Sequence, residues 1–471
     1  MKPLRINRLV VVSFVNGMSL MVFELVAARL LAPTIGSSTY IWTSVIGVII
    51  AMLALGSWLG GRLADLRKNL LDIAFLLLFA AFSIAVVAIF ASRFFDGLSQ
   101  LALDMRLKGV IASLVLFAPT SFLVGVIGPY LAKLNVRSLE YTGRSVANLD
   151  AMNALGGIFG TFLTGFVLFS LVGSWNILWL LGILLVGLSW MIMPSRQRRL
   201  RLLLSLAVVC APLITVWPNV LHVDTATAHY VIADITTRQR KTRVLMSGPG
   251  GYQSGVDLDA TDDLVFWYTK AAAEATTYVD SPRRILVLGG GAFTLPRALA
   301  AKYPEATIDV VEIDPELEKI AKDHFFYTSP ANVRVIADDA RVFVDTTKET
   351  YDVVIVDVYT DDSVPFTVLT KEYAASLGRI VRPHGIAIAN VIASQDTCQP
   401  YFVAAATPYM DAFGHGWFAA ERPSGISNHV MLFSRRDLAV GAAFQPFDLP
   451  AQAPRYSDNF APAEALQHGC H

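Results

Sequence analysis

At residues 284–291 the sequence reads Arg284-Ile285-Leu286-Val287-Leu288-Gly289-Gly290-Gly291, a short apolar run followed directly by three glycines. Apolar runs of this length are typical of strands buried in a parallel sheet. Glycines after such a strand let the backbone approach a ligand closely. The next residues read as a turn into a helix, with Thr294 as N-cap and Pro296 in the first turn. The segment therefore predicts a strand, a glycine-rich loop and a helix.

Acidic residues stand at the ends of the strands that follow. Apolar runs at 308–311, 333–336, 353–356 and 386–389 predict four further strands, and the first three end in Glu312, Asp338-Asp339 and Asp357. Ligands of an open parallel sheet bind at the carboxyl ends of its strands. Glu312 lies about 20 residues past the glycines, where a carboxylate accepts hydrogen bonds from ribose hydroxyls. The alternative is that these acids only cap helices. Their combination with the glycines favours an α/β Rossmann-like domain that binds a nucleoside.

The N-terminal half has the composition of a membrane protein. Of the 471 residues, 54% are hydrophobic and 16% charged, and the net charge is zero. These values exclude a disordered chain and argue against a nucleic-acid partner. Apolar stretches near or above the length that crosses a bilayer occur at 9–33, 39–61, 70–92, 108–132, 150–172, 175–193 and 201–217. The sequence predicts a polytopic α-helical membrane domain with six or seven spans.

The domain boundaries follow from a change of pattern near 217–224, where apolar runs shorten to strand length. We expect the membrane domain at 1–217, a small N-terminal β region at 222–280, the Rossmann-like domain at 281–440 and an irregular tail at 441–471.

Basic residues are distributed unevenly among the short loops. The N-terminus and the loops after the second, fourth and sixth spans contain Lys2, Arg5, Arg8, Arg62, Arg67, Lys68, Lys133, Arg137, Arg144, Arg196, Arg198, Arg199 and Arg201. The loops after the first and fifth spans contain no lysine or arginine, and the loop after the third mixes both signs. This pattern puts the N-terminus in the cytoplasm. Six spans leave the C-terminal half in the cytoplasm, whereas a seventh at 201–217 puts it outside. The sequence leaves both open.

Two kinds of residue within the spans predict helix contacts. Gly56 with Gly60 and Gly156 with Gly160 have the spacing that lets membrane helices approach closely. Glu24 and Arg29 lie in the first span, where a charge needs a partner or water. We expect an ion pair or network between helices, and the alternative is a substrate or proton pathway.

The region from about 224 to 435 resembles the spermidine synthase family of aminopropyltransferases, which share the S-adenosylmethionine methyltransferase fold. The resemblance rests on Leu288-Gly289-Gly290-Gly291, Val311-Glu312-Ile313-Asp314, Ala337-Asp338-Asp339-Ala340, the stretch 351–357 and Leu369-Thr370-Lys371-Glu372-Tyr373. The stretches His229-Tyr230-Val231-Ile232 and Gly251-Tyr252-Gln253-Ser254 look like the family's small β region. With its membrane half, the whole chain resembles membrane-fused spermidine-synthase-like proteins.

This resemblance implies a donor site and an amine site. In the family, the residue matching Glu312 binds ribose and the one matching Asp339 binds the adenine amino group. The donor site is then formed by Gly289, Gly290, Gly291, Glu312, Asp338 and Asp339. Asp357 matches the first aspartate of the family's gate loop. The second stands three residues on, where this chain has Thr360, so that Asp361 and Asp362 are the substitutes. Gln253 and Tyr268 match positions that line the amine pocket.

One departure concerns the residue after the three glycines. The family has an aspartate there, which helps to hold the cationic aminopropyl group, and this chain has Ala292. The loss puts polyamine synthesis in doubt or moves charge recognition to another acid.

The resemblance implies a membrane-anchored aminopropyltransferase. It would transfer an aminopropyl group from decarboxylated S-adenosylmethionine, a co-substrate, to a diamine such as putrescine. The amine must lose a proton to attack, so a carboxylate is needed as base, and Asp357, Asp361 and Asp362 are the candidates. The alternatives are a methyltransferase that uses S-adenosylmethionine and a non-catalytic transporter that senses a polyamine or nucleoside.

We expect no metal and no prosthetic group, because no His or Cys residues have metal-ligand spacing. Cys210, Cys398 and Cys470 are expected to be structural thiols. The predicted partners are the lipid bilayer and a small amine, and a homo-oligomer is compatible with the sequence. The predicted location is the inner (plasma) membrane. A cytoplasmic synthase-like domain is expected because adenosyl-sulfonium compounds are made there.

Overall fold

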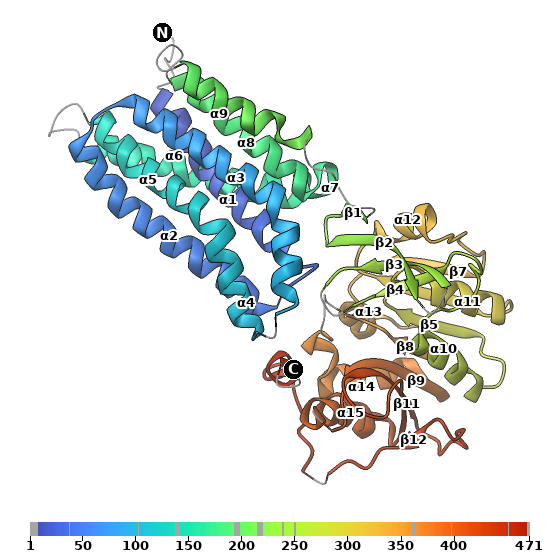
Figure 1. Ribbon diagram of the computed structural model, residues 1–471. Coiled ribbons are helices and arrows are strands. Elements are labelled where there is room, and N and C mark those ends of the chain that lie inside the picture. The colour runs from blue at the N-terminus through green and yellow to red at the C-terminus, as the bar shows by residue number, and fades with distance from the viewer. Residues whose placement is uncertain are drawn as a thin grey trace. The chain divides into compact units, whose positions relative to one another are not determined.

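The computed structural model describes residues 8–36, 38–101, 103–136, 142–192, 198–213, 220–237, 240–248, 251–359, 364–396, 398–450 and 452–468 (Figure 1). The chain forms two compact units. The first, here the helical unit, comprises Met1–Pro218 with His222–Tyr230, and the second comprises Asn219–Leu221 with Val231–His471.

The helical unit is built from long apolar helices. Its helices are α1 (Arg8–Leu31), α2 (Thr39–Leu66), α3 (Leu70–Ser99), α4 (Met105–Ala112), α5 (Ala118–Asn135), α6 (Thr142–Leu163), α7 (Phe169–Val172), α8 (Ser174–Ile192) and α9 (Arg198–Cys210), with π-helical turns at Ser113–Phe117 and Thr164–Leu168 and a 3-10 turn at Ala211–Leu213. Across the described residues, six helical segments are long and apolar enough to cross a membrane: Arg8–Leu31, Thr39–Leu66, Leu70–Ser99, Met105–Asn135, Thr142–Val172 and Ser174–Ile192. The chain therefore has the segments of a multi-pass membrane protein.

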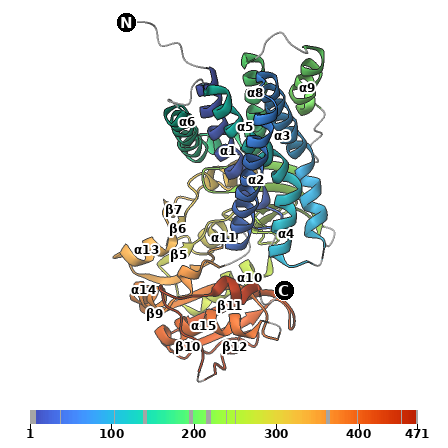
Figure 2. The ribbon, with the colours of Figure 1, turned by 90° about the vertical axis from the view of Figure 1, so that its left-hand side faces the viewer.

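Glycines let two helix pairs pack backbone against backbone. A Cβ on Gly156 of α6 would lie 1.9 Å from the Phe14 carbonyl oxygen of α1, and a Cβ on Gly56 of α2 would lie 2.2 Å from the Phe122 oxygen of α5. Figure 2 shows α1 beside α6. The predicted close packing at the glycine pairs is confirmed, since any side chain would force the helices apart.

The second unit contains most of a small antiparallel sheet and all of a larger mixed one. The strands β1 (Val220–Asp224), β2 (His229–Thr237), β3 (Arg240–Met246) and β4 (Ser254–Asp257) follow one another in the small sheet. The large sheet has the order β12-β10-β11-β9-β8-β5-β6-β7. Its strands are β5 (Arg284–Leu288), β6 (Thr307–Glu312), β7 (Val333–Ala337), β8 (Tyr351–Val356), β9 (Val381–Ala393), β10 (His415–Ala420), β11 (Ser427–Ser434) and β12 (Gln445–Pro446).

Helices connect the strands of the large sheet. They are α10 (Trp267–Ala275), α11 (Thr294–Lys302), α12 (Leu317–His324), α13 (Ala340–Thr346), α14 (Lys371–Ile380), α15 (Gln399–Phe413) and α16 (Ala463–His468), with 3-10 turns at Thr276–Tyr278 and Phe366–Val368. Strands β7, β6, β5, β8 and β9 run parallel, whereas β11, β10 and β12 pair antiparallel. The predicted α/β fold and all five predicted strands are confirmed. The parallel arrangement places the ends of β5, β6 and β8 along one edge.

The start of α11 differs from the prediction. The N-cap position is Phe293, not Thr294, and its backbone is left-handed at φ 58°. The Phe293 side chain is fully buried and packs on Tyr327, with ring centroids 4.8 Å apart. Tertiary packing of this ring fixes the turn, so a side-chain cap is replaced by a buried aromatic anchor.

Candidate active site

The glycine loop joins the ends of three strands. Gly289 has φ 94°, and a Cβ there would lie 2.2 Å from the Asp357 carbonyl oxygen. Only glycine fits this position. Other residues disfavour this positive φ, and their Cβ would clash with the Asp357 carbonyl oxygen. Next to it, the Gly290 N–H donates to Glu312 Oε2 over 2.7 Å. The loop is therefore held between the ends of β6 and β8.

Glu312 is the buried carboxylate of this edge. It is 7% exposed, and its Oε1 accepts a hydrogen bond from the Asp314 N–H over 3.0 Å. Burial raises the pKa of Glu312, and the backbone donors oppose that rise. A carboxylate has about four acceptor lone pairs, so Glu312 retains capacity for ribose hydroxyls.

The two aspartates after β7 have different local partners. Asp339 is the N-cap of α13 and accepts from the Val342 N–H over 3.0 Å. Asp338 Oδ1 accepts from the Asp339 N–H over 2.8 Å, while the Asp338 N–H donates to the Glu312 carbonyl over 3.2 Å. Asp338 is thus linked to Glu312 through the backbone, and Asp339 has the capping role that the sequence offered as the alternative.

Asp357 lies at the end of β8 among polar side chains from other elements. The Asn390 amide of β9 donates to Asp357 Oδ1 over 3.0 Å. The Tyr268 hydroxyl of α10 also contacts the Asp357 carboxyl and donates to the Gln253 carbonyl oxygen over 2.8 Å. Burial raises the pKa of Asp357 to about 6, helped by the charge of Glu312 and opposed by the bonds from Asn390 and Tyr268. The structure therefore brings Asp357, Tyr268 and Gln253 together.

Two side-chain amide oxygens of this region are buried without a hydrogen-bond donor. In the part of the chain that the structure describes, neither Gln253 Oε1 nor Asn390 Oδ1 has a partner. Leaving a buried acceptor unpaired costs about 1–3 kcal/mol. Asn390 Oδ1 belongs to the same amide that donates to Asp357, so this oxygen and the Asp357 carboxylate are neighbouring acceptors suited to a ligand that carries N–H donors.

Asn390 and Tyr359 were missed by sequence reasoning. The Tyr359 hydroxyl accepts from the Ile392 N–H over 2.8 Å and donates to the Asn390 carbonyl over 3.1 Å, which fixes the strand around Asn390. A polar residue inside an otherwise apolar strand was the available signal for Asn390. Asp361 and Asp362 lie outside the described residues.

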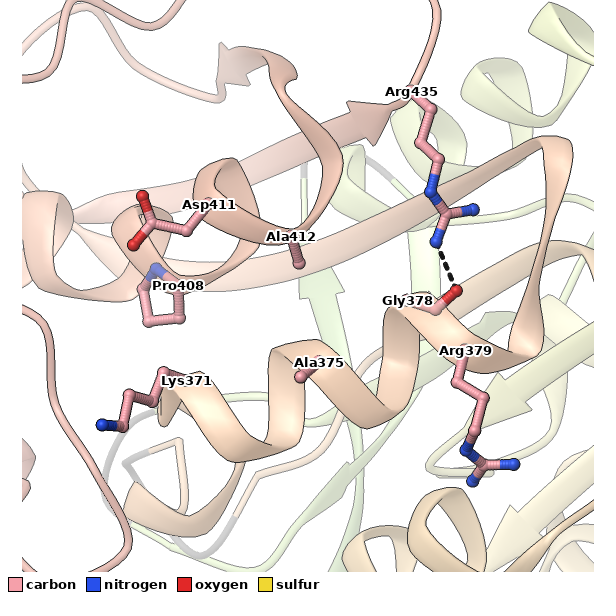
Figure 3. A pocket seen from close by; sticks show the side chains of 8 residues that line it. All are labelled: Lys371, Ala375, Gly378, Arg379, Pro408, Asp411, Ala412 and Arg435. Atoms are coloured by element: carbon pink, nitrogen blue, oxygen red, sulfur yellow. Dashed lines mark hydrogen bonds between the residues drawn. The ribbon is translucent and has the colours of Figure 1, made fainter.

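A separate surface pocket of about 390 Å³ lies between α14 and α15 (Figure 3). The arginines that line this pocket already donate hydrogen bonds to backbone carbonyls. Arg435 donates to the carbonyls of Gly378 and Val381, and Arg379 donates to carbonyls at the end of α13. This pocket is remote in sequence from the glycine loop and contains none of the predicted site residues.

Comparison with known families identifies part of the second unit. Residues 266–402 match the model of the spermine/spermidine synthase domain. The chain carries a spermine/spermidine synthase domain. The predicted resemblance is confirmed, and the matched range includes the glycine loop, Glu312, Asp357 and Asn390.

Relatives of the synthase domain are distant. A polyamine aminopropyltransferase of Vibrio vulnificus is 28% identical over 233 residues, which are 43% of this chain and 76% of that protein. Polyamine aminopropyltransferase 2 of Streptomyces coelicolor is 27% identical over 400 residues, 78% of this chain and 70% of that protein, so its match includes part of the helical unit. The crystal structure of a probable spermidine synthase from Corynebacterium glutamicum covers 49% of this chain and 94% of its own, at 24% identity and a TM-score of 0.42.

Proposed function

We propose that the synthase domain transfers an aminopropyl group from decarboxylated S-adenosylmethionine to an amine acceptor. The family supports this proposal, because several relatives are named aminopropyltransferases. The observation that carries it is the surroundings of Asp357. Its ionisable carboxyl accepts from the Asn390 amide, whose own oxygen is buried without a donor among the described residues, and acceptors of this kind are what a protonated amine needs.

The chemistry requires a base and an acceptor-rich pocket. The lone pair of the amine nitrogen attacks the carbon next to the sulfonium, forming a C–N bond while the C–S bond breaks. The electron pair of that bond stays on sulfur, which becomes a neutral thioether. The acceptor amine is protonated at neutral pH and must lose a proton. With a pKa of about 6, Asp357 is largely ionised at pH 7 and takes this proton.

The remaining residues are proposed to hold the donor and the amine. Glu312 would bind the ribose hydroxyls, and the glycine loop would let the donor approach the backbone. Asp338 and Asp339 would face the adenine. Gln253 and Tyr268 would orient the amine, the first through its free Oε1 and the second through its position beside Asp357.

A methyltransferase is the second candidate, and Ala292 favours it. Ala292 is 1% exposed, so no carboxylate is available at this point of the loop to hold a positively charged aminopropyl group. S-adenosylmethionine carries an additional carboxylate, which an aspartate at this position would repel and an alanine accepts. Calorimetry with both donors separates the candidates: the aminopropyltransferase binds the decarboxylated donor more tightly, and the methyltransferase the intact one.

The activity test uses the purified full chain in detergent with decarboxylated S-adenosylmethionine and putrescine. Mass spectrometry should detect spermidine and methylthioadenosine. Asp357→Asn should lower turnover by about 10²–10⁴-fold, the usual contribution of a general base, while donor binding remains. Asp262→Asn makes the same chemical change at a side chain that is 96% exposed and should leave turnover unchanged. Absence of product with every amine tried, together with no binding of the decarboxylated donor, would refute the proposal.

A further inference from the structure

The helical unit has two ends, and side-chain contacts define which helix termini share each end. At one end, Arg8 of α1 donates to the Met191 carbonyl of α8 over 3.3 Å, and Ser189 of α8 donates to the Ala74 carbonyl of α3 over 2.7 Å. Lys133 of α5 pairs with Asp65 of α2 at this end over 2.5 Å. We call it the basic end. The N-termini of α1, α3 and α6 and the C-termini of α2, α5 and α8 lie at this end.

The basic end is the cytoplasmic end by its charge. The loops and helix ends gathered there contain Arg8, Arg62, Arg67, Lys68, Lys133, Arg144 and Arg199 among the described residues. The opposite end has Arg29, Arg93, Arg106 and Lys108. Acidic residues occur at both ends: Asp65 and Asp72 at the basic end, and Asp96, Asp104 and Asp224 at the opposite end. Short loops rich in lysine and arginine stay in the cytoplasm. The opposite end, where α1 finishes and α8 begins, therefore faces outward.

Helix α9 leads the chain back from the basic end. Arg201 donates to the Ser189 carbonyl, Trp190 donates to Ser205 over 3.0 Å, and a Cβ on Gly182 would lie 3.2 Å from Val208. As α9 proceeds, its contacts move from the end of α8 toward the beginning of α8, so the two helices are antiparallel (Figures 1 and 2). Its 13 residues rise about 20 Å. It is shorter than the six candidate spans, and it packs on α3 and α8 within the bundle.

The chain then reaches the outward end, where residues 222–230 are fixed to α1 and α8. Both the backbone N–H and the hydroxyl of Ser174 donate to Asp224, over 2.8 and 2.7 Å. Arg29 lies 3.6 Å from Asp224 and donates to the Thr225 carbonyl over 2.5 Å. The partner that the sequence required for Arg29 is thus Asp224. We call this group the outer clamp: Arg29, Ser174, His222, Asp224, Thr225 and His229.

The outer clamp is a buried group of charged and polar side chains. The side chains of Arg29, Asp224 and His229 are 10%, 6% and 2% exposed. His229 Nδ1 lies 3.0 Å from Asp224 Oδ1, and its other ring nitrogen lies 3.0 Å from His222 Nδ1. Burial raises the pKa of Asp224, but the bonds from His229 and Ser174 outweigh it and leave that pKa below its ordinary value. A buried charge that lost its partner would be strongly destabilising.

An independent observation concerns the oxidation state of the synthase domain. Cys398 is disulfide-bonded, contrary to the thiol expected from the sequence, and Cys210 is free. Cys470 lies outside the described residues. Disulfides persist in extracytoplasmic compartments and are rare in the reducing cytoplasm.

We propose that the chain, led by α9 from the basic end toward the opposite end, returns across the membrane before the outer clamp, so that the synthase domain is extracytoplasmic. Four observations support the outer side of the membrane for this domain: the charge pattern, the course of α9, the outer clamp and the oxidised Cys398. This replaces the cytoplasmic domain that was expected on chemical grounds. The compartment does not rest on the proposed function.

A consequence for the substrates does rest on the proposed function. A sulfonium donor carries a permanent positive charge, and a charge crosses the hydrocarbon core only at high cost. A donor made in the cytoplasm must therefore be exported before this domain can use it. The acceptor amine is then one that is present outside the cytoplasm.

The test labels cysteines introduced one at a time into the full chain with a membrane-impermeant maleimide. Asp262→Cys places a thiol on the exposed surface of the synthase domain, and Gly143→Cys places one at the start of α6, where an added side chain meets open space. Both are made in a Cys210→Ser background, which alone serves as the blank. In spheroplasts, Asp262→Cys should be labelled without permeabilisation and Gly143→Cys only after it.

Any other labelling pattern overturns the proposal, in particular labelling of both thiols only after permeabilisation. A second measurement needs no substitution. Fusion of alkaline phosphatase to the C-terminus of the native chain should give an active enzyme, because that reporter folds only in an oxidising compartment, while a fused green fluorescent protein should be dark. The reverse result also overturns the proposal. Neither measurement depends on catalysis, so a failure here is distinct from a failure of the proposed function.

Discussion

At the level of single residues, Asn390 is placed to tune the acidity of Asp357. Its amide donates to Asp357 Oδ1 and thereby lowers the pKa of that carboxyl, which burial raises to about 6. Asn390→Ala removes the donor, so the pKa of Asp357 should rise further. Because only the ionised carboxylate takes up a proton, kcat/KM falls as the pH falls through this pKa. The acid limb of the profile should therefore lie near pH 6 in the native chain and at higher pH in the variant.

The control for this prediction is Asn428→Ala on the neighbouring strand β11. The Asn428 amide donates to the exposed Glu421 carboxylate over 3.3 Å and, among the described residues, does not bond to Asp357. Its pH profile should match that of the native chain. If Asn390→Ala lowered the rate equally at every pH, its role would be structural and not a control of the Asp357 proton.

Single residues also show how far sequence reasoning reaches. Glu312 and Asp357 could be predicted because each directly follows an apolar strand, and strand ends are readable from the pattern. Asn390 could not, because its importance arises from a contact with a residue 33 positions earlier on the neighbouring strand. The same limit applies to Gln253, whose backbone carbonyl accepts from Tyr268 of α10.

At the level of elements, the turn after β5 gives a matched pair of glycine substitutions. Gly289 and Gly425 both have positive φ, 94° and 76°, but only Gly289 faces a backbone atom at 2.2 Å, whereas Gly425 faces open space. Gly425→Ala should cost about 1–3 kcal/mol of stability from backbone strain alone. Gly289→Ala should cost more, and should also abolish donor binding by moving the loop away from β8. Thermal unfolding and calorimetry measure the two effects, and equal losses in both variants would contradict the close approach seen here.

The elements themselves were largely readable from sequence. The five strands at 284–389 were predicted because apolar runs of strand length alternate with charged helices, and the structure has each of them. The start of α11 was predicted wrongly, because the capping rule considers local hydrogen bonds and Phe293 is fixed by a distant ring. Local rules succeed where a residue's conformation is set by residues close to it in sequence. They fail where a contact with a distant residue sets it instead.

At the level of the whole molecule, the seventh crossing could not be settled from sequence. Segment 201–217 is short and begins with arginine, and length alone left both sides of the membrane open. The contact that matters most joins Arg29 to Asp224, residues separated by about two fifths of the chain. The sequence contained one signal of it, a charge near the end of an apolar helix that required a partner.

The extracytoplasmic placement and the proposed reaction together predict that the enzyme is active only when its substrates are on the outer side of the membrane. The sulfonium donor does not cross a lipid bilayer unaided, so it reaches only the face to which it is added. Sealed right-side-out vesicles that contain the full chain should form the aminopropylated amine when donor and putrescine are added outside. Inverted vesicles should do so only after detergent permeabilisation. Asp357→Asn in right-side-out vesicles is the control for catalysis by this site. If intact inverted vesicles formed the product and right-side-out vesicles did so only after detergent, the proposed reaction would stand and the extracytoplasmic placement would be refuted. Absence of product in both preparations even after detergent would instead refute the reaction and leave the placement to the labelling experiment.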